Sequence, residues 1–209
     1  MKTLTQFMLT SILLAMSSIT WSAEDKLEGW DFAKDKDGIK IYTRKLEGAV
    51  FKEFHATVKM KTTVADLVAL YSDPAKCADW LPDCKSAHLV EKTTDAKFIT
   101  YTEVNNPWPI KNRDYILQIN VTRNSQTGEA TIDFSDLKDG VPANKCCIRM
   151  GMVKGFWKFT PAEDGNVIVT YEYKFLPGGD LPVSAVNAAV PDLAYDTLTK
   201  MKQYIEHVK

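Results

Sequence analysis

The last stretch of the chain, Leu176 to Val208, constrains the fold most. It opens with the turn Pro177-Gly178-Gly179, after which Asp180 stands where a helix N-cap is expected and Pro182 falls in the first helical turn. Apolar residues then recur at spacings of three and four, the period of an amphipathic helix: Val183, Val186, Val190, Leu193, Tyr195, Leu198, Met201 and Ile205. The sequence therefore predicts one long helix at the end of the chain.

The first half of this helix carries small side chains on its apolar face. Ala185, Ala188 and Ala189 leave that half shallow, whereas a helix that only fills a core carries larger side chains there. Pro191 removes a backbone donor in mid-run, which predicts a kink between Asn187 and Pro191. Such a helix could lie over a cavity as a lid. It could equally be an Ala-rich helix that closes an ordinary α+β domain.

Residues 1–23 have the pattern of a cleaved signal peptide. Lys2 gives a positive start, Phe7 to Met16 form a short apolar run, and small residues precede a cut near Ala23. The run is shorter than the roughly 20 apolar residues that span a bilayer. We therefore expect a periplasmic or secreted protein with one domain over residues 24–209. The formal net charge is −1 without a block of like charge, which argues against a nucleic-acid partner.

Most of the remaining chain predicts β-strands. Suitable apolar or alternating segments occur at 30–34, 39–44, 50–60, 86–91, 97–103, 113–123, 130–134, 147–160 and 167–175. Between the third and fourth of these the period becomes helical: Thr63 and Asp66 resemble a capping box, and Pro74 and Pro82 divide the rest of that segment into short helical pieces around Trp80. Strands first and a long helix last predict an α+β domain, with an antiparallel sheet and the helix packed on one face.

Four segments, in order along the chain, resemble the START (steroidogenic acute regulatory protein-related lipid transfer) domain. They are Trp30 with Asp37 to Arg44, Pro107-Trp108-Pro109 with Asn112 to Tyr115, Pro177 to Asn187, and Tyr195 to Leu198. The likeness is greatest to small exported bacterial members of the family. It implies a helix-grip fold, in which a curved antiparallel sheet wraps around the C-terminal helix and encloses a hydrophobic cavity. The helix and the 135–145 loop would form the gate.

The resemblance also implies the function. A START-like protein binds a hydrophobic small molecule, here a phospholipid, a fatty acyl chain or a quinone-like compound, and transfers or senses it. We expect transient contact with a membrane surface, a monomer, and neither a cofactor nor a metal, since His55, His88 and His207 show no metal-ligand spacing. One alternative is an enzyme of the cyclase or hydrolase type, which needs acid–base groups inside the cavity. Another is a protein-interaction domain whose cavity is filled by large side chains.

The strand at 113–123 supplies the first candidate contacts. A period of two puts Arg113, Leu117 and Ile119 on one face, which the resemblance makes the cavity face. Arg113 either holds a carboxylate or phosphate of the ligand or braces the loop of Trp108. The full set of expected contacts is Thr100, Thr102, Trp108, Arg113, Leu117, Ile119, Met152, Tyr171, Tyr173, Val186, Ala189, Val190 and Leu193. Most of these are apolar or neutral, which favours a carrier over an enzyme.

One departure from the family bears on the ligand. Sterol-handling members carry a buried arginine further along this strand, opposite a carboxylate. Ile119 and Thr102 occupy those positions here. Because a buried ion pair needs both of its members, their joint replacement makes the cavity more apolar. The sequence therefore argues against a sterol hydroxyl as the polar handle of the ligand.

The cysteines fall into two pairs. Cys77 and Cys84 flank Trp80, and in an oxidising compartment we expect them to form a disulfide that stabilises the fold by roughly 2.5 kcal/mol on the chain-entropy model. Cys146 and Cys147 are expected not to pair, because neighbouring residues of a strand point to opposite faces.

Overall fold

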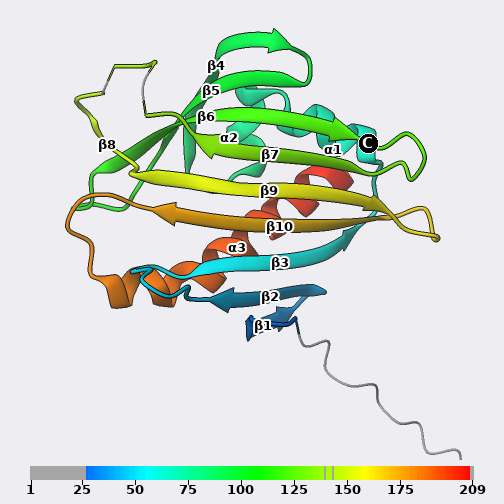
Figure 1. Ribbon diagram of the computed structural model, residues 1–209, viewed down its shortest axis with the longest axis horizontal. Helices are drawn as coiled ribbons and strands as arrows, with labels where there is room; N and C mark the ends of the chain where they lie inside the picture. Colours follow the sequence, from blue (N-terminus) through cyan, green and yellow to red (C-terminus); the bar gives the residue numbers. More distant parts are fainter. Residues whose placement is uncertain (1–26, 139, 143, 208–209) are drawn as a thin grey trace, which may run out of the picture.

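The computed structural model describes residues 27–138, 140–142 and 144–207 (Figure 1). The predicted signal peptide, residues 1–23, lies outside this range. The strands are β1 (Asp31–Lys36), β2 (Ile39–Arg44), β3 (Glu53–Met60), β4 (Cys84–Thr94), β5 (Lys97–Val104), β6 (Asn112–Arg123), β7 (Ala130–Asp136), β8 (Cys147–Arg149), β9 (Met152–Pro161) and β10 (Val167–Leu176). The helices are α1 (Val64–Tyr71), the 3-10 turn η1 (Pro74–Lys76), α2 (Cys77–Trp80) and α3 (Val183–His207). Among the described residues, no helix is long and apolar enough to cross a membrane.

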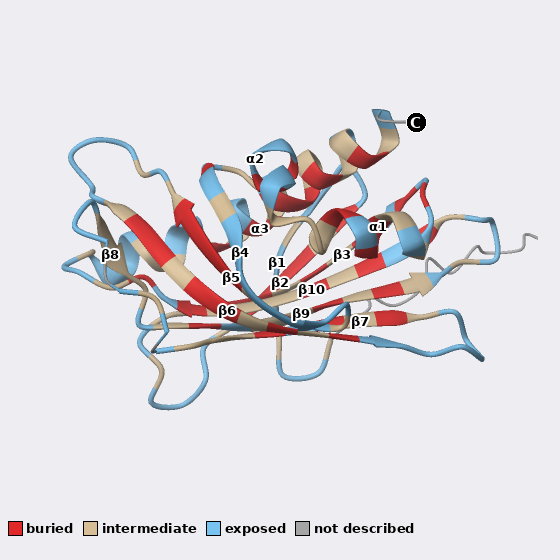
Figure 2. Cartoon of the chain, turned by 90° about the horizontal axis from the view of Figure 1, so that it is seen from above, coloured by how far each residue is buried: buried red, intermediate tan, exposed pale blue. Residues whose placement is uncertain are grey.

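The strands form one sheet in the order β1-β2-β3-β10-β9-β7-β6-β5-β4, in which neighbours are antiparallel. The sheet is curved, and Figure 2 shows α1, α2 and α3 together on one side of it. This is the predicted helix-grip fold. Large side chains line the sheet's inner face, where the rings of Trp157 and Tyr171 stack with centroids 3.7 Å apart.

The prediction of one strand over 147–160 is wrong. Residues 147–149 form β8, which lies off the main path and pairs in parallel with β6. Two backbone hydrogen bonds fix the chain between β8 and β9. The amide of Met150 donates to the carbonyl of Asp114, and the amide of Gly151 donates to the carbonyl of Leu176, each at 2.9 Å. Because β9 starts afresh after the break, the alternation of inward and outward side chains is reset.

Helix α3 is built in two halves. In the second half Ala194, Leu198, Met201 and Ile205 are buried, and they anchor the helix in the core. In the first half Val190 is buried and Val186 is half-buried, whereas Ala189 and Leu193 are exposed. Pro191 lies inside the helix near the junction, and α3 runs through it to His207. The shallow first half therefore does not pack against the sheet as the second half does.

The start of α3 differs from the prediction. The helix begins at Val183, three residues after Asp180, so Asp180 is not its N-cap. The carbonyl of Pro182 accepts the first helical bond from Val186, at 3.1 Å. The turn before it requires glycine, because Gly178 has φ +67° and a Cβ there would lie 3.0 Å from the carbonyl oxygen of Arg149. At α1, by contrast, the predicted cap is confirmed: Thr63 Oγ1 accepts from the amide of Asp66 at 3.1 Å.

Two disulfides are present. Cys77 and Cys84 are joined as expected, with Cα atoms 5.9 Å apart, and they link α2 to the start of β4. The expectation for Cys146 and Cys147 is wrong, since these neighbours are joined to each other. The strand begins only at Cys147, and Cys146 belongs to the preceding turn. The rule that strand neighbours point to opposite faces therefore does not apply to this pair.

Candidate ligand-binding cavity

A cavity of about 310 Å³ lies beneath the first half of α3. Strands β6, β7, β9 and β10 supply its wall through Tyr115, Leu117, Phe134, Val153, Trp157, Tyr171 and Tyr173. The helical segment after β3 contributes Tyr71, Trp80 and Leu81, and α3 contributes Val186, Ala189, Val190, Leu193 and Thr197. The lining is therefore mostly aromatic and aliphatic, as in sites that bind apolar small molecules.

The predicted contacts separate into three groups. The residues that line the main cavity are Arg113, Leu117, Tyr171, Tyr173, Val186, Ala189, Val190 and Leu193. The residues that line a smaller cavity of about 50 Å³, which shares Tyr115 and Leu117 with the first, are Thr100, Thr102 and Ile119. Trp108 and Met152 line neither cavity, and the side chain of Trp108 is 93% exposed between β5 and β6. As ligand contacts, all of these remain predictions.

Several lining residues were missed from the sequence. Tyr71 and Trp80 lie at the ends of α1 and α2, and a short helix gives no periodic signal long enough to orient one side chain. Met150 and Val153 line the cavity where Met152 was expected. The break between β8 and β9 explains this shift, because it changes which alternate residues of β9 face inward.

The rim of the cavity is formed by two loops. Asn105 and Asn106 come from the loop between β5 and β6, and Pro177 and Leu181 come from the turn between β10 and α3. Of the described residues in the 135–145 loop, none lines the cavity. The loop at 105–111, rather than the one at 135–145, thus stands beside the first turns of α3 at the rim.

The tyrosines of the wall are uncharged at neutral pH. Burial raises the pKa of Tyr71, Tyr171 and Tyr173, and it raises the pKa of Tyr115 to about 12. Among the lining residues that the structure describes, Asp83 and Arg113 carry the charges. The wall therefore offers neutral hydroxyl groups and one buried cation to a ligand.

That cation, Arg113, joins the two loops of the rim. Its Nη1 donates to the carbonyl of Lys111 at 2.6 Å, its Nε to that of Pro177 at 3.2 Å, and its Nη2 to that of Gly178 at 3.0 Å. It is 4% exposed, and burial lowers the pKa of its guanidinium. No carboxylate in the described part of the chain forms an ion pair with Arg113. The bracing role considered from the sequence is therefore present.

The neighbouring acid is fully paired. Asp114 is 1% exposed and accepts two bonds from Arg149, from Nε at 2.9 Å and from Nη2 at 3.0 Å. The hydroxyl of Tyr101 donates a third, also at 3.0 Å. Adjacent strand residues point to opposite faces, so Asp114 stabilises β8 on one side while Arg113 faces the cavity on the other.

A curved sheet, a covering C-terminal helix and an apolar cavity between them define a helix-grip ligand-binding domain. The START domain family model matches residues 17–209, and the chain belongs to this family. START domains bind lipids and other hydrophobic ligands.

Three comparisons place the chain among known proteins. It is 30% identical over 179 residues to an uncharacterised protein of Pseudomonas aeruginosa, covering 86% of this chain and 88% of that one. The crystal structure of the STAR-related lipid transfer protein (fragment 25–204) from Xanthomonas axonopodis is similar with a TM-score of 0.80 and 31% identity, over 86% of this chain and 100% of that one. The Zhui aromatase/cyclase from Streptomyces sp. R1128 has a TM-score of 0.52 at 14% identity, over 75% of this chain and 95% of its own, which shows a common fold alone.

Proposed function

We propose that this protein carries or senses a single hydrophobic molecule, without chemically changing it, in the cavity beneath α3. The observation that carries the proposal is the unfilled space under the first half of the helix. Ala189 and Leu193 line the cavity there and remain exposed, although Ala194, Leu198 and Met201 in the second half of the same helix are fully buried. A domain whose cavity had been filled by large side chains would leave no such space.

The size of the cavity favours a particular kind of cargo. Sites for small molecules measure about 300–1,000 Å³, and a cavity of about 310 Å³ stands at the lower end of this range. It therefore suits a fatty acyl chain or a compact quinone-like molecule better than a phospholipid with two chains. Arg113 supports an anionic end group, because only three of its five N–H groups are engaged and its charge lacks an acidic partner among the described residues.

An enzyme of the cyclase type is the second candidate, because the Zhui aromatase/cyclase shares the fold. Acid–base catalysis works best with groups whose pKa lies near neutral pH. The tyrosines of this wall have pKa values raised by burial, and no histidine lies among the described lining residues. These features favour a carrier.

The two disulfides bear on location. Disulfides form and persist mainly outside the cytoplasm, in the periplasm or beyond the cell. Together with the sequence pattern of residues 1–23, they support a periplasmic or secreted location. We further propose that the carrier acts as a monomer and meets its cargo at a membrane surface.

The test uses two neighbouring alanines. Ala189 lines the cavity and Ala188 does not, so Ala189→Phe takes space that the ligand needs while Ala188→Phe is its matched control. We expect Ala189→Phe to melt close to the wild type and to lose most uptake of a fluorescent fatty acid, whereas Ala188→Phe retains it. In a solid core the same change would cost about 1–3 kcal/mol of stability.

Native mass spectrometry of protein purified from its own compartment completes the test. A carrier retains an apolar molecule whose mass identifies it. The proposal fails if the wild type takes up no lipid probe and Ala189→Phe loses stability. A bound molecule that the protein converts into a product would instead establish the enzyme.

A further inference from the structure

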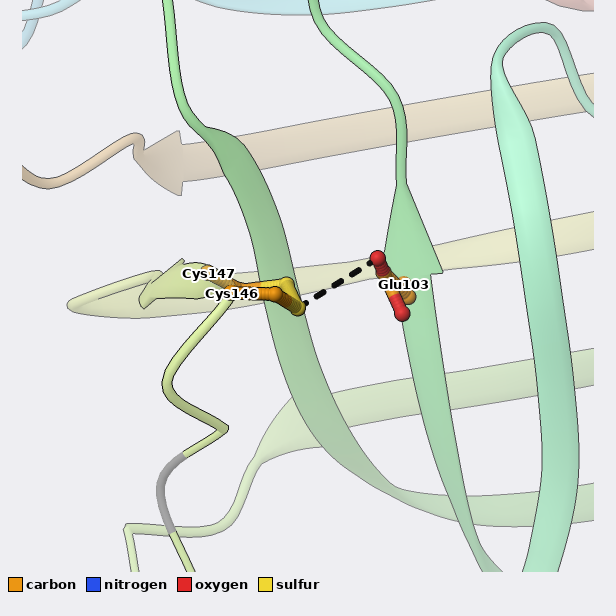
Figure 3. Close-up of side chains that lie close together, drawn as sticks. All are labelled: Glu103, Cys146 and Cys147. Carbon is orange, nitrogen blue, oxygen red and sulfur yellow. Dashed lines mark hydrogen bonds between the residues drawn. A yellow bond between two sulfur atoms is a disulfide. The ribbon is translucent and has the colours of Figure 1, made fainter.

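The disulfide between Cys146 and Cys147 lies directly against a buried carboxylate (Figure 3). The Sγ atom of Cys146 is 3.4 Å from Oε1 of Glu103, and one ligand atom from each of the three residues lies within 4.8 Å of the others. Glu103 comes from β5 and is 7% exposed, whereas Cys146 is exposed and Cys147 is half-buried. Since a disulfide sulfur carries no proton, the contact becomes a donated hydrogen bond only when the cysteines are reduced.

Stabilisation does not explain this disulfide. In the chain-entropy model the stabilisation grows with the length of the closed loop, and a bond between adjacent residues closes the shortest loop that a chain can form. The bond is also accessible, because Cys146 is exposed at the turn before β8. Exposed disulfides are more readily reduced than buried ones and are often the regulatory or functional ones.

Glu103 is held in place beside the disulfide by an ion pair with Lys85. Nζ of Lys85 donates to its Oε1 at 2.8 Å, and Nδ2 of Asn112 donates to the same atom at 3.2 Å. These bonds fix the carboxylate from β4 and β6, the strands on either side of β5. The same Oε1 lies next to Sγ of Cys146, so a cation bound there would take the place of the Lys85 ammonium or use Oε2, to which no described side chain donates a hydrogen bond.

We propose that reduction of Cys146–Cys147 opens a site for a thiophilic divalent cation such as Zn²⁺, ligated by both thiolates and by Glu103. A dithiol reductant breaks the S–S bond, is oxidised to its own disulfide, and gives its two protons to the cysteine sulfurs. Binding of the cation then releases these two protons to solvent.

The geometry is close to what such a site needs. Zn²⁺ binds thiolate at about 2.3 Å and carboxylate oxygen at about 2.0–2.2 Å, so that two donors of a tetrahedral site lie roughly 3.5–3.8 Å apart. Sγ of Cys146 is already 3.4 Å from Oε1 of Glu103, and the three donors lie within 4.8 Å of one another. The two sulfur atoms are joined in the disulfide, so reduction is what lets them separate to the spacing of two zinc ligands. Three protein ligands leave the fourth position to water, the arrangement typical of zinc sites that remain open.

The experiment titrates the whole protein with Co²⁺, a spectroscopic substitute for Zn²⁺. The chain is reduced with dithiothreitol, which is then removed without air, and near-ultraviolet absorbance follows thiolate-to-cobalt charge transfer. We expect saturation at one Co²⁺ per chain in the reduced protein, displacement by Zn²⁺, and no charge-transfer band in the oxidised protein. Lipid uptake plays no part in this readout, so the proposal stands or falls separately from the carrier function.

Three variants locate the site. The double variant C146S/C147S should lose the charge-transfer band and should retain the Cys77–Cys84 disulfide, whereas C77S/C84S should retain the band. Glu103→Gln should weaken Co²⁺ binding by roughly tenfold or more, since even loss of an outer-shell partner costs about 10–100-fold in affinity. The proposal is overturned if reduced wild type gives no band, if C146S/C147S keeps it, or if Glu103→Gln binds as tightly as wild type.

Discussion

The role of Arg113 depends on its hydrogen-bond partners as much as on its position in the strand. Its place on a strand face followed from the alternation of β6, but its bonds to the carbonyls of Pro177 and Gly178 did not, because they depend on where the β10–α3 turn folds back. In these bonds the guanidinium N–H groups donate to neutral carbonyls, so the positive charge has no acidic partner among the described residues. A buried cation of this kind is a natural partner for an anion brought in by a ligand.

A pair of ligands tests this role without altering the protein. A fatty acid and its methyl ester have the same chain, and only the acid carries a carboxylate for Arg113. A hydrogen bond to a charged group contributes about 1.5–3 kcal/mol, so the acid should bind roughly tenfold or more tightly in displacement assays. In Arg113→Gln the preference should vanish, and retained affinity for the ester would show that the variant is folded. Equal affinities in the wild type would contradict the assignment.

Two results trace to one premise of the sequence analysis, a single strand over 147–160: the pairing of Cys146 was predicted wrongly, and Met152 does not line the cavity. Cys146 belongs to a turn and pairs with its neighbour, and Met152 belongs to a strand that starts again after Gly151. The break depends on backbone bonds to Asp114 and Leu176, which are distant in sequence, and no local pattern could reveal it.

At the scale of elements, the long periodic segments were the predictable ones. The helix over Val183–His207 and the strictly alternating strand β10 follow from hydrophobic periodicity, and so does an antiparallel sheet. The short helices α1 and α2 supply Tyr71 and Trp80 to the cavity lining, and one or two turns give too little periodicity to orient a single side chain. The parallel pairing of β8 with β6 has no local signal at all.

The division of α3 into two halves gives a matched pair of substitutions. Leu198 is 0% exposed in the second half, and Leu193 is 37% exposed in the first half, where it lines the cavity. Leu198→Ala should cost about 2–5 kcal/mol of unfolding free energy, because it leaves a cavity in the core. Leu193→Ala should cost about 1 kcal/mol or less and should change ligand affinity. Denaturant unfolding beside probe displacement checks both, and equal losses of stability would refute the division.

At the scale of the whole molecule, the rim of the cavity carries exposed apolar groups. Trp108 is 93% exposed and Ile110 is 37% exposed, both in the loop whose Asn105 and Asn106 line the rim. Tryptophan is enriched at membrane–water interfaces, since its ring is apolar and its N–H is polar. This loop is therefore the part of the surface that we expect to contact a membrane when cargo passes through the rim.

Transfer between vesicles tests this expectation. Trp108→Ser should slow the movement of a fluorescent fatty acid from donor to acceptor vesicles and should leave affinity in free solution unchanged, because Trp108 lines neither cavity. Phe32→Ser is the control: Phe32 is also exposed, at 59%, but lies on β1 at the edge of the sheet. If both variants slow transfer alike, or neither does, the loop has no special role at the membrane.

The two halves of α3 also separate the rate of cargo exchange from the rate of unfolding. A helix buried along its whole length can move only if the core comes apart with it. Here the anchored half spans Ala194 to Ile205, and Pro191, which has no amide to donate, lies at the boundary with the half above the cavity. Release of residues 183–189 is thus a local opening, which breaks the hydrogen bonds of Asn187 to the segment before β3 but leaves Val190 and the buried second half in the core. The exchange of cargo and the lifetime of the folded state are therefore governed by different stretches of one helix, and selection can adjust the first without changing the second.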